Sequence, residues 1–470
     1  MLQQTLRDED RVVILGAGPT GLGAAHRLKE LGHTHFHIYD RAKQVGGLAT
    51  SHKDQQGFVW DIGGHVQFSH YRYFDALMVA ALGNRWLNHE RESWVWIEDR
   101  FVPYPFQNNI RYLTPESRWK CIQGLVQIYK QPFQGRPKNF AEWILATFGP
   151  GLADVFMVPY NFKVWAYPPA KMDYNWIGER VAVTDLEKVL YNVLHEKDDL
   201  SWGPNNTFQF PEFGGTGAVW ESVANLVGRE NITLNTEVTG VNPSAKKVHF
   251  ADGSTADYDI LISTLPIDRL VSLAALNHLK EPAGKLMYSS SNIIGIGLSG
   301  KPPASLTRKC WMYFPESNCP FYRVTVFSNY SPNNVPDINS QWSLMAEISE
   351  SPDKPVDVQN VVDDTIEGLF QTKLINKAHE VLSTWHYRAH YGYPTPGLGR
   401  DHALSAIQPE LEKLGIYSRG RFGGWKYEIS NQDHSLMQGV ELVDKLKLGV
   451  PEVTYWFPGT ANNMGYAKTR

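Results

Sequence analysis

Apolar and polar positions along the first forty residues follow two different periods. Residues 12–15 form a continuous apolar run, which predicts a short buried strand. Apolar residues then recur at helical spacing, at Leu22, Ala25, Leu28 and Leu31, and Gly32 is placed to end that helix. Residues 35–39 predict a second strand. An order of strand, helix and strand is typical of a parallel α/β sheet.

Farther along the chain, helical patterns come first and strand patterns follow. Residues 94–103 alternate and turn like a hairpin. Apolar spacing predicts helices over residues 117–130, 139–147, 152–157 and 185–195. Strands are expected over residues 292–299, 321–328 and 342–350, and a helix over residues 356–369. A final helix is expected from about Asp433, with Leu436, Val440, Val443 and Leu446 on one face.

The glycines after the first strand add a specific chemistry. Gly16, Gly18 and Gly21 have GxGxxG spacing, and Asp40 closes the second strand. The first glycine permits a tight turn, the second admits a pyrophosphate, and the third lets helix and strand pack closely. A carboxylate about 20 residues after the glycines binds ribose hydroxyls. Together these features predict a Rossmann-like dinucleotide site.

A second pair of glycines indicates which dinucleotide is bound. Gly46 and Gly47 follow shortly after Asp40, where a nicotinamide domain has no need of them. In FAD proteins of the glutathione-reductase type, such a turn continues along the cofactor. Residues 248–255 predict a hairpin and residues 258–266 a buried strand, an order with which flavoproteins often return to the adenine. The alternative is that these last two segments belong to an unrelated sheet.

These patterns predict an α/β fold with a discontinuous FAD-binding domain of the glutathione-reductase or amine-oxidase kind. That domain is expected over residues 1–90, 214–284 and 415–470. A helical domain carrying substrate flaps is expected over residues 110–210. A mixed or antiparallel β-sheet domain for the substrate is expected over residues 91–109 and 285–414.

Composition and charge exclude several classes of protein. The 470 residues are 42% hydrophobic with a formal net charge of −4, so no basic surface for nucleic acid or a membrane is expected. Cys121, Cys310 and Cys319 have neither metal nor disulfide spacing, which fits a reducing cytoplasm. The first residues lack a signal-peptide pattern, and no run approaches the roughly 20 apolar residues of a membrane span. We therefore expect a cytoplasmic protein.

The sequence contains no pattern of a hydrolase triad, a metal site or a P-loop. Gly63, Gly64 and His65 suit a loop pressed against a flat ring, although a turn with a surface histidine is equally consistent. The aromatic turn at residues 104–107 could stack on a base, but such turns more often belong to a core. Aromatic clusters with arginine and asparagine suit a sugar nucleotide, because arginine forks match diphosphate oxygens.

Two loops and one strand carry the polar residues of greatest interest. Residues 178–180 and 202–205 could be lids that close over a ligand. Any single arginine there is more often a surface ion-pair residue. Arg323 lies inside an aromatic run, where a buried guanidinium needs an anion. Tyr393, Tyr427 and Asn431 complete the set.

Several stretches share their motifs with one known family. They are residues 63–71, 102–109, 159–166, 178–182, 202–205, 310–316, 318–323, 327–332, 419–427 and 431–435. On these stretches the chain resembles the flavin-dependent UDP-galactopyranose mutases of the eukaryotic kind, from fungi and trypanosomatids. The resemblance runs from about residue 10 to about residue 445 and is specific, since unrelated FAD proteins share only the two glycine turns. A shorter tail and a shortened segment after Asn333 leave the oligomeric state open, a homo-oligomer included.

The resemblance implies roles for individual residues. FAD would be bound by Gly16, Gly18, Pro19, Thr20, Gly21, Asp40, Arg41, Gly46, Gly47, Leu48, Gly63, Gly64, His65, Val238, Gly423, Asn431, Gln432 and Ser435. The diphosphate would be held by Arg180 and Arg323, assisted by Tyr330, Tyr393 and Tyr427. The uridine would be held by Tyr104, Phe106, Gln107, Phe156, Asn161 and Trp165, and the sugar by Arg421, Asn205 and Trp311, with Tyr313 and Asn431 as further substrate contacts. The residues expected to act in catalysis are His65, Arg180 and Arg323.

The activity that the resemblance implies is the interconversion of UDP-galactopyranose and UDP-galactofuranose without net redox. N5 of reduced FAD would attack the anomeric carbon and displace UDP, after NADPH or NADH has reduced the flavin. The protein would supply position and charge, which accounts for the absence of an evident acid–base pair or metal site. Arg180 and Asn205 would ride on two flaps whose closure excludes water.

Three other functions are compatible with parts of the sequence. An amine-oxidase-like FAD oxidoreductase would need an apolar cage at the flavin rather than paired arginines and tyrosines. A non-catalytic carrier such as the GDP-dissociation inhibitors shares the general fold, but the intact glycine turns and Asp40 argue against it. A mutase for a related nucleotide sugar differs by one substituent of the hexose, which the sequence does not resolve.

Overall fold

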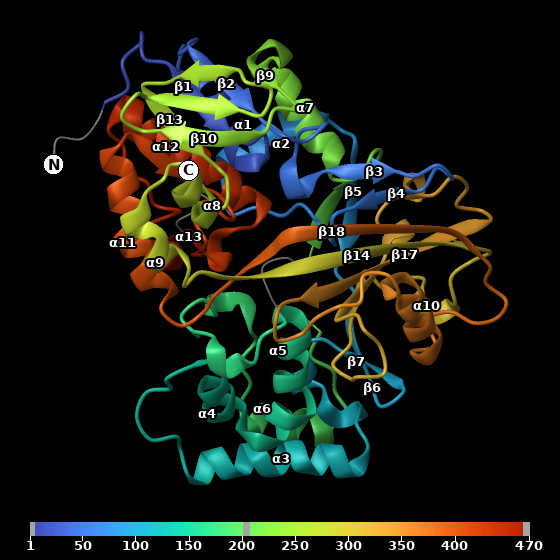
Figure 1. The fold of residues 1–470 in the computed structure, drawn as a ribbon. Helices are drawn as coiled ribbons and strands as arrows, with labels where there is room; N and C mark the ends of the chain where they lie inside the picture. The colour runs from blue at the N-terminus through green and yellow to red at the C-terminus, as the bar shows by residue number, and fades with distance from the viewer. Residues whose placement is uncertain (1–4, 201–206, 464–470) are drawn as a thin grey trace.

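The computed structural model describes residues 5–200 and 207–463, and Figure 1 shows its α/β architecture. Five parallel strands form the first sheet, in the order β19 (Ile416–Ser418), β13 (Ile260–Ser263), β1 (Val12–Leu15), β2 (Phe36–Tyr39) and β9 (Ile232–Thr233). Neighbours in this sheet come from distant parts of the chain. The α/β fold class expected from the sequence is thereby confirmed.

Both faces of the five-stranded sheet are covered. Val12 and Ile14 of β1 pack into a core with α1 (Pro19–Glu30), α2 (Arg72–Leu82), α7 (Gly217–Val227) and α12 (Gln432–Leu448). Val13 and Leu15 pack on the opposite face with β10 (Val238–Asn242), β11 (Lys247–Phe250), α8 (Ile267–Leu273) and α11 (Arg400–Lys413). Successive residues of a strand point to opposite faces, so an apolar run without alternation marks a strand buried on both sides.

A seven-stranded sheet crosses the middle of the molecule (Figure 1). Its order is β18 (Val381–Thr395), β14 (Met287–Ser299), β17 (Gln341–Glu350), β16 (Arg323–Val326), β15 (Trp311–Tyr313), β6 (Ser93–Ile97) and β7 (Arg100–Pro103). Neighbouring strands are antiparallel except for β15 and β6, which are parallel. The sheet is therefore mixed, as expected.

The two faces of this sheet pack against different partners. Ile294 and Ile296 of β14 share a core with α10 (Val361–Gln371). On the other face lies the hairpin of β3 (Ser51–Lys53) and β4 (Val59–Asp61). A Cβ at Gly295 would lie 2.5 Å from the Trp60 ring, so the lack of a side chain there lets the indole lie directly on the strand. The hairpin thereby forms part of the core on this face of the seven-stranded sheet.

A group of helices forms the lower part of Figure 1. Its main members are α3 (Pro115–Lys130), α4 (Phe140–Leu152), α5 (Val158–Trp165) and α6 (Leu186–Leu194). Helices α3 and α4 approach closely, and a Cβ at Gly124 would lie only 2.6 Å from the backbone nitrogen of Gly151. Their shared core is rich in aromatic and aliphatic side chains, among them Phe140, Ile144, Phe148 and Trp165.

The segment from Phe140 to Trp165 is helical over 26 residues and is long and apolar enough, by length and composition, to cross a membrane. The expectation that no segment approaches this length was therefore too strong. The segment is not straight, because Gly149 has a φ of 70° and residues Ala153–Met157 form a π-helix. Within it, the buried Lys163 donates hydrogen bonds to the carbonyls of Glu316 and Cys319. These contacts are those of a helix packed inside a protein core.

Most elements lie where the pattern predicts them, and the exceptions have physical causes. The helix expected from residue 356 begins at Val361, because a turn precedes it, in which the N–H of Asn360 donates to the carbonyl of Asp357 at 3.2 Å. The helix expected last, α12, is followed by the short α13 (Pro458–Ala461). The pairing of β5 (Trp86–Glu90) with β8 (Thr207–Pro211) joins distant segments and has no local signal. The expected limits of the three domains stay a prediction.

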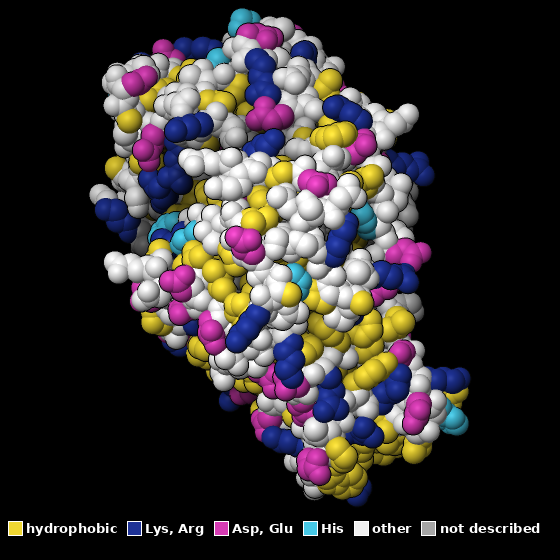
Figure 2. All heavy atoms as spheres, turned by 90° about the vertical axis from the view of Figure 1, so that its right-hand side faces the viewer, with side chains coloured by type: hydrophobic (Ala, Val, Ile, Leu, Met, Phe, Trp, Pro, Cys, Tyr) yellow, Lys and Arg dark blue, Asp and Glu magenta, His cyan; other side chains and the backbone are white. Residues whose placement is uncertain are grey.

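Figure 2 shows basic and acidic side chains interspersed on one face of the molecule, with no field of a single sign. Apolar side chains are visible at its lower end, where the helical part lies. Trp119 and Tyr129 of α3 are among the most exposed aromatic residues, at 62% and 76%.

Candidate functional site

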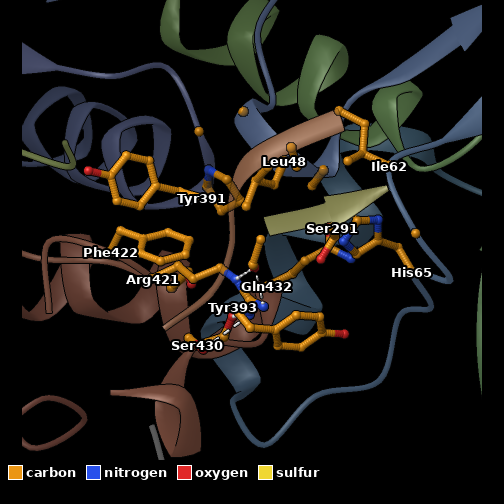
Figure 3. A pocket seen from close by; sticks show the side chains of 18 of the residues that line it. Leu48, Ile62, His65, Ser291, Tyr391, Tyr393, Arg421, Phe422, Ser430 and Gln432 are labelled. Carbon is orange, nitrogen blue, oxygen red and sulfur yellow. Dashed lines mark hydrogen bonds between the residues drawn. The ribbon is translucent and has the colours of Figure 1, made fainter. Parts of the chain in front are cut away.

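One large cavity of about 650 Å³ lies where the two sheets and the helical part meet. Figure 3 shows part of its wall, with Arg421, Tyr393 and Gln432 near one another and His65 beside Ser291. The wall combines glycine turns from the first sheet with arginines, tyrosines and tryptophan from the second sheet and the helical part. Residues far apart in the sequence thus form a single site.

The first glycine turn forms one part of the wall. Gly16 follows β1 with a φ of 107°, and α1 begins at Pro19 with Gly18 as its N-cap. No side chain of a described residue caps this helix, so its first backbone N–H groups are available to an anion in the cavity. Asp40 accepts hydrogen bonds from the backbone N–H groups of Ala17 at 2.7 Å and Ala42 at 2.8 Å. The carboxylate therefore also holds the turn in shape.

The second glycine turn packs directly on the first. The N–H of Gly46 donates to the carbonyl of Ala17 at 2.8 Å. Gly47 has a φ of 57°, and a Cβ on it would lie 3.3 Å from the Cα of Gly18. A side chain at Gly47 would therefore be strained and would press against the first turn. Two bare backbone turns beside a helix N-terminus form a cradle that fits the pyrophosphate of FAD.

His65 stands on the wall near the second sheet. Its Nδ1 atom is buried and has no hydrogen-bond partner among the described residues. Burial, together with the charges of Arg421 and Arg323, lowers the pKa of His65 to about 4, although Glu347 opposes this shift. The imidazole is therefore neutral at neutral pH, and its Nδ1 is left for a group in the cavity. An aromatic ring with one unused nitrogen suits contact with a flavin.

Three arginines reach the cavity, each held differently. Arg421 donates to the carbonyls of Gly392 and Ser430 and has no carboxylate partner within the described part of the chain. Arg180 donates to the carbonyl of Glu428 at 2.5 Å and lies 5.7 Å from the centre of the Tyr427 ring. Arg323 forms a two-bond pair with a carboxylate of β17. Among these three arginines, the structure records a direct ion pair with a described carboxylate for Arg323 alone.

The structure brings together most of the residues expected to contact the cofactor. The cavity is lined by Gly16, Gly18, Pro19, Thr20, Asp40, Arg41, Gly47, Leu48, Gly63, Gly64, His65, Val238, Asn431, Gln432 and Ser435. Gly21, Gly46 and Gly423 lie behind the wall. Gly21 lets α1 approach β1, because a Cβ there would overlap the carbonyl of Gly16.

The residues expected to contact the substrate divide into two groups. Those that line the cavity are Tyr104, Arg180, Trp311, Tyr313, Arg323, Tyr393, Arg421, Tyr427 and Asn431. Those that do not are Phe106, Gln107, Phe156, Asn161, Trp165 and Tyr330. Asn205 lies outside the described residues.

The second group is buried behind the wall by its own contacts. Phe106 stacks on Phe156 with ring centres 4.4 Å apart. The side-chain amide of Gln107 donates to the carbonyl of Ala182, next to Arg180. Asn161 donates to the carbonyl of Met157 at 2.7 Å. The hydrogen bond of Gln107 thus links this layer to the segment that carries Arg180.

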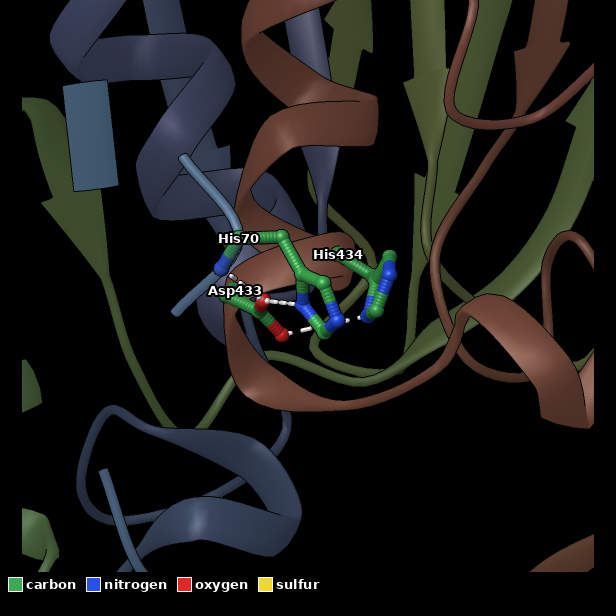
Figure 4. A group of neighbouring side chains, drawn as sticks. All are labelled: His70, Asp433 and His434. Carbon is green, nitrogen blue, oxygen red and sulfur yellow. Dashed lines mark hydrogen bonds and ion pairs between the residues drawn. The ribbon is translucent and has the colours of Figure 1, made fainter. Parts of the chain in front are cut away.

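A second polar cluster, of His70, Asp433 and His434, borders the cavity at the first turn of α12 (Figure 4). Asp433 pairs with His70 Nδ1 at 2.8 Å and with His434 Nδ1 at 3.1 Å. Burial alone would raise the pKa of Asp433, but the two histidines, His434 first, lower it. A helix N-terminus favours a carboxylate and disfavours a cation. We therefore interpret the cluster as a buried polar network that fixes the start of α12, and we assign no metal to it.

Several wall residues were missed by the sequence reasoning, chiefly Arg91, Glu347 and Tyr391. Arg91 lies 5.4 Å from the centre of the Trp311 ring, and its local sequence carries no signal for this. Glu347 does carry one, because it interrupts the apolar run of β17. A charge inside a buried strand needs a partner, and this is the same signal that Arg323 carries.

Comparisons with known proteins agree with this geometry. Residues 19–424 match the family of flavin containing amine oxidoreductases. A crystal structure of reduced UDP-galactopyranose mutase is 48% identical, covers 96% of this chain and 97% of its own, and superposes with a TM-score of 0.94. Cyclohexylamine oxidase from Brevibacterium oxydans IH-35A is 12% identical, over 93% of this chain and 98% of its own, with a TM-score of 0.65. A fatty acid isomerase from P. acnes is 13% identical, over 94% and 99%, with a TM-score of 0.64. The last two share the fold alone.

Proposed function

The chain belongs to the flavin containing amine oxidoreductases and, among them, to the UDP-galactopyranose mutases, and on this basis we propose that it interconverts UDP-galactopyranose and UDP-galactofuranose. The observation that carries the proposal is a single cavity that joins two glycine turns to three arginines and a group of tyrosines. An FAD cradle and an anion-binding wall in one space suit a flavin that acts on a nucleotide sugar.

FAD fits the residues of the first sheet. The N-terminus of α1 and the turns at Gly18 and Gly47 would hold its pyrophosphate, and Asp40 its ribose. His65 and the turn before it would face the isoalloxazine, and Gln432 and Ser435 would contact the cofactor from α12. When bound and reduced, FAD supplies the nucleophile for the anomeric carbon through N5.

The arginines would serve the diphosphate and the sugar. Arg323 and Arg180 would bind the diphosphate, with hydroxyl groups from Tyr393 and Tyr427, and stabilise its negative charge as UDP departs. Arg421 lacks a carboxylate partner in the described part of the chain, so its charge would favour an anion beside the sugar. Placing fixed positive charge where negative charge develops is the main contribution that such side chains make to catalysis.

The uridine would contact expected substrate residues of both groups, those that line the cavity and those buried behind its wall. Tyr104 already faces the cavity, whereas Phe106, Gln107 and Phe156 form the layer behind it. We propose that the segment carrying Arg180 moves on binding, releases Gln107 from Ala182 and admits the base to this layer. Return of the segment would then exclude water from the reacting sugar.

The remaining expectations are part of the same proposal. We propose that the enzyme is of the eukaryotic kind, that NADPH or NADH reduces its flavin, and that it acts in the cytoplasm. UDP-galactopyranose and UDP-galactofuranose would be its ligands, without nucleic acid or membrane partners. The exposed aromatic residues of α3 are compatible with a homo-oligomer. A nucleotide sugar that differs at one substituent stays the nearest alternative substrate.

The residues of the cavity wall support the alternative function, an amine-oxidase-like oxidoreductase, less well than the mutase. An amine oxidase would surround the flavin with apolar groups, whereas Arg323, Arg421 and His65 stand on this wall. A non-catalytic carrier is also less well supported, because both glycine turns form a complete cradle. Purified protein that is colourless would favour the carrier.

Product analysis tests the proposed function directly. Dithionite-reduced, FAD-loaded protein is incubated with UDP-galactofuranose, and the nucleotide sugars are separated by chromatography. We expect conversion to UDP-galactopyranose with the reduced protein and none with the oxidised protein. Activity without any reductant would exclude the nucleophilic flavin, and no conversion in either state would exclude the mutase.

A further inference from the structure

We propose that Glu347 is a positioning residue, whose single carboxylate fixes both the Arg323 guanidinium and the backbone of Gly64 beside His65. The proposal rests on the proposed function of the cavity and extends it to a residue with no expected role. It joins two parts of the site, the anion-binding arginine and the loop that would face the flavin.

The contacts of Glu347 use both of its oxygens. Oε1 accepts from Arg323 Nε at 2.7 Å and from the Gly64 N–H at 3.0 Å. Oε2 accepts from Arg323 Nη2 at 2.8 Å and from the Tyr322 hydroxyl at 2.8 Å. The side chain of Glu347 is only 2% exposed. Four donors on a buried carboxylate leave it almost no freedom to move.

The pair with Arg323 follows from the sheet. Arg323 on β16 and Glu347 on β17 are direct partners in an antiparallel register, so their side chains stand on the same face. A guanidinium has five N–H donors in a fixed plane, and two of them are used by Glu347. The other three donors can therefore serve a ligand, and the two-bond pair sets the plane in which they point.

The contact with Gly64 connects the same carboxylate to His65. Gly63 has a φ of 102°, and a Cβ at Gly64 would lie 3.4 Å from Glu347 Oε1. The loop thus packs on the carboxylate itself, without a side chain between them. A change at residue 347 should therefore reach the flavin-facing loop as well as the arginine.

A purely structural ion pair on the same strand provides a matched control. Glu350, three residues farther along β17, accepts from Arg388 Nε at 2.8 Å and Nη2 at 2.9 Å. This pair has the same two-bond geometry, but neither residue lines the cavity. Comparing Glu347→Gln with Glu350→Gln therefore separates positioning in the site from general support of the sheet.

Three readouts on the FAD-loaded enzyme test the proposal. For Glu347→Gln we expect a flavin absorption spectrum altered before any substrate is added, because the His65 loop is released. We expect UDP to bind at least about tenfold more weakly, measured by tryptophan fluorescence, since loss of a charge-assisted pair misaligns Arg323. We expect kcat to fall by at least about a hundredfold, beyond any change in KM. Glu350→Gln should stay within about threefold of wild type in binding and kcat.

The outcomes separate this proposal from the proposed function. If both variants match wild type in all three readouts, Glu347 has no positioning role. Equal losses in both variants also overturn it, because they indicate general damage to the sheet. If Glu347→Gln does not fold, Glu347→Asp, which keeps the charge but shortens its reach, is measured against the same thresholds. A wild-type enzyme that converts no UDP-sugar contradicts the proposed function instead, while the substrate-free flavin spectrum still tests the link from Glu347 to the loop.

Discussion

The Arg323 side chain combines a structural ion pair with a place on the cavity wall. Its guanidinium is drawn to Glu347 and also faces the cavity, so it has both a structural partner and a free set of donors. Among the residues that the structure describes, Arg421 is held by carbonyl and hydroxyl oxygens and has no carboxylate to balance its charge, although both arginines line the wall. A substrate anion in the cavity would therefore meet two kinds of guanidinium. Arg323 is paired with a carboxylate, and Arg421 is not paired with any described carboxylate.

Replacement of Arg323 by alanine tests the diphosphate assignment. We expect kcat/KM to fall by two orders of magnitude or more, consistent with loss of about 3 kcal/mol of charge-assisted bonding. Steady-state kinetics of the reduced enzyme measure this loss. Arg388→Ala is the control, since it breaks the comparable pair with Glu350 away from the cavity. Near wild-type kinetics for Arg323→Ala would remove the assignment.

At the scale of elements, the β3–β4 hairpin is joined to the start of α7 by one buried carboxylate. Asp61 accepts from the Ser51 hydroxyl at 2.5 Å and from the N–H of Thr216 at 3.2 Å. Burial raises the pKa of Asp61 to about 7, although these hydrogen bonds oppose the shift. The folded protein therefore favours the protonated carboxyl, because the effect of burial outweighs that of these hydrogen bonds.

This raised pKa predicts that the enzyme loses stability as the pH rises. Between the ordinary pKa of 3.8 and about 7, the folded state holds a proton that the unfolded state has released. The free energy of unfolding should then fall by up to about 1.4 kcal/mol per pH unit across this window. In Asp61→Asn the side chain cannot ionise, so its Tm should exceed that of wild type by a margin that grows from pH 5 to 7.

Thermal unfolding followed by circular dichroism from pH 5 to 8 measures this margin. The exposed Asp363→Asn on α10 is the control, and its difference from wild type should stay small throughout. A constant margin for Asp61→Asn across the series would show that Asp61 is ionised in the folded enzyme.

At the scale of the whole molecule, the cavity is the place where the sheets and the helical part meet. Its wall takes residues from the first sheet, the second sheet and the segment of Arg180. A cofactor bound there would contact elements of all three parts. FAD should therefore act as a structural bridge as well as a reactant.

Removal of FAD tests that role. We expect the apoprotein to unfold at a lower temperature than the holoenzyme, because a ligand bound only to the folded state stabilises it by about 3 to 4 kcal/mol at 100 to 1,000 times its Kd. Differential scanning calorimetry of both forms measures the shift, and added FAD should restore it. Identical transitions for the two forms would mean that the cofactor does not link the parts.

The sequence by itself determined the features that depend on neighbours along the chain. Gly16, Gly18 and Gly21 between two apolar runs specify a turn, a helix start and a close contact, all within a few residues. The strand and helix patterns likewise reflect local periodicity, and most were confirmed. The mutase family was also recognisable, because its motifs are continuous stretches of the chain.

Only the tertiary structure decided which side chains meet. Arg323 finds Glu347 through the register of β16 and β17, and no local pattern records that pairing. Tyr104 faces the cavity while Phe106, two residues later, is buried on Phe156, because packing in the helical part fixes the turn between them. Periodicity encodes the environment of each element, whereas strand order and close packing place distant side chains within hydrogen-bonding distance.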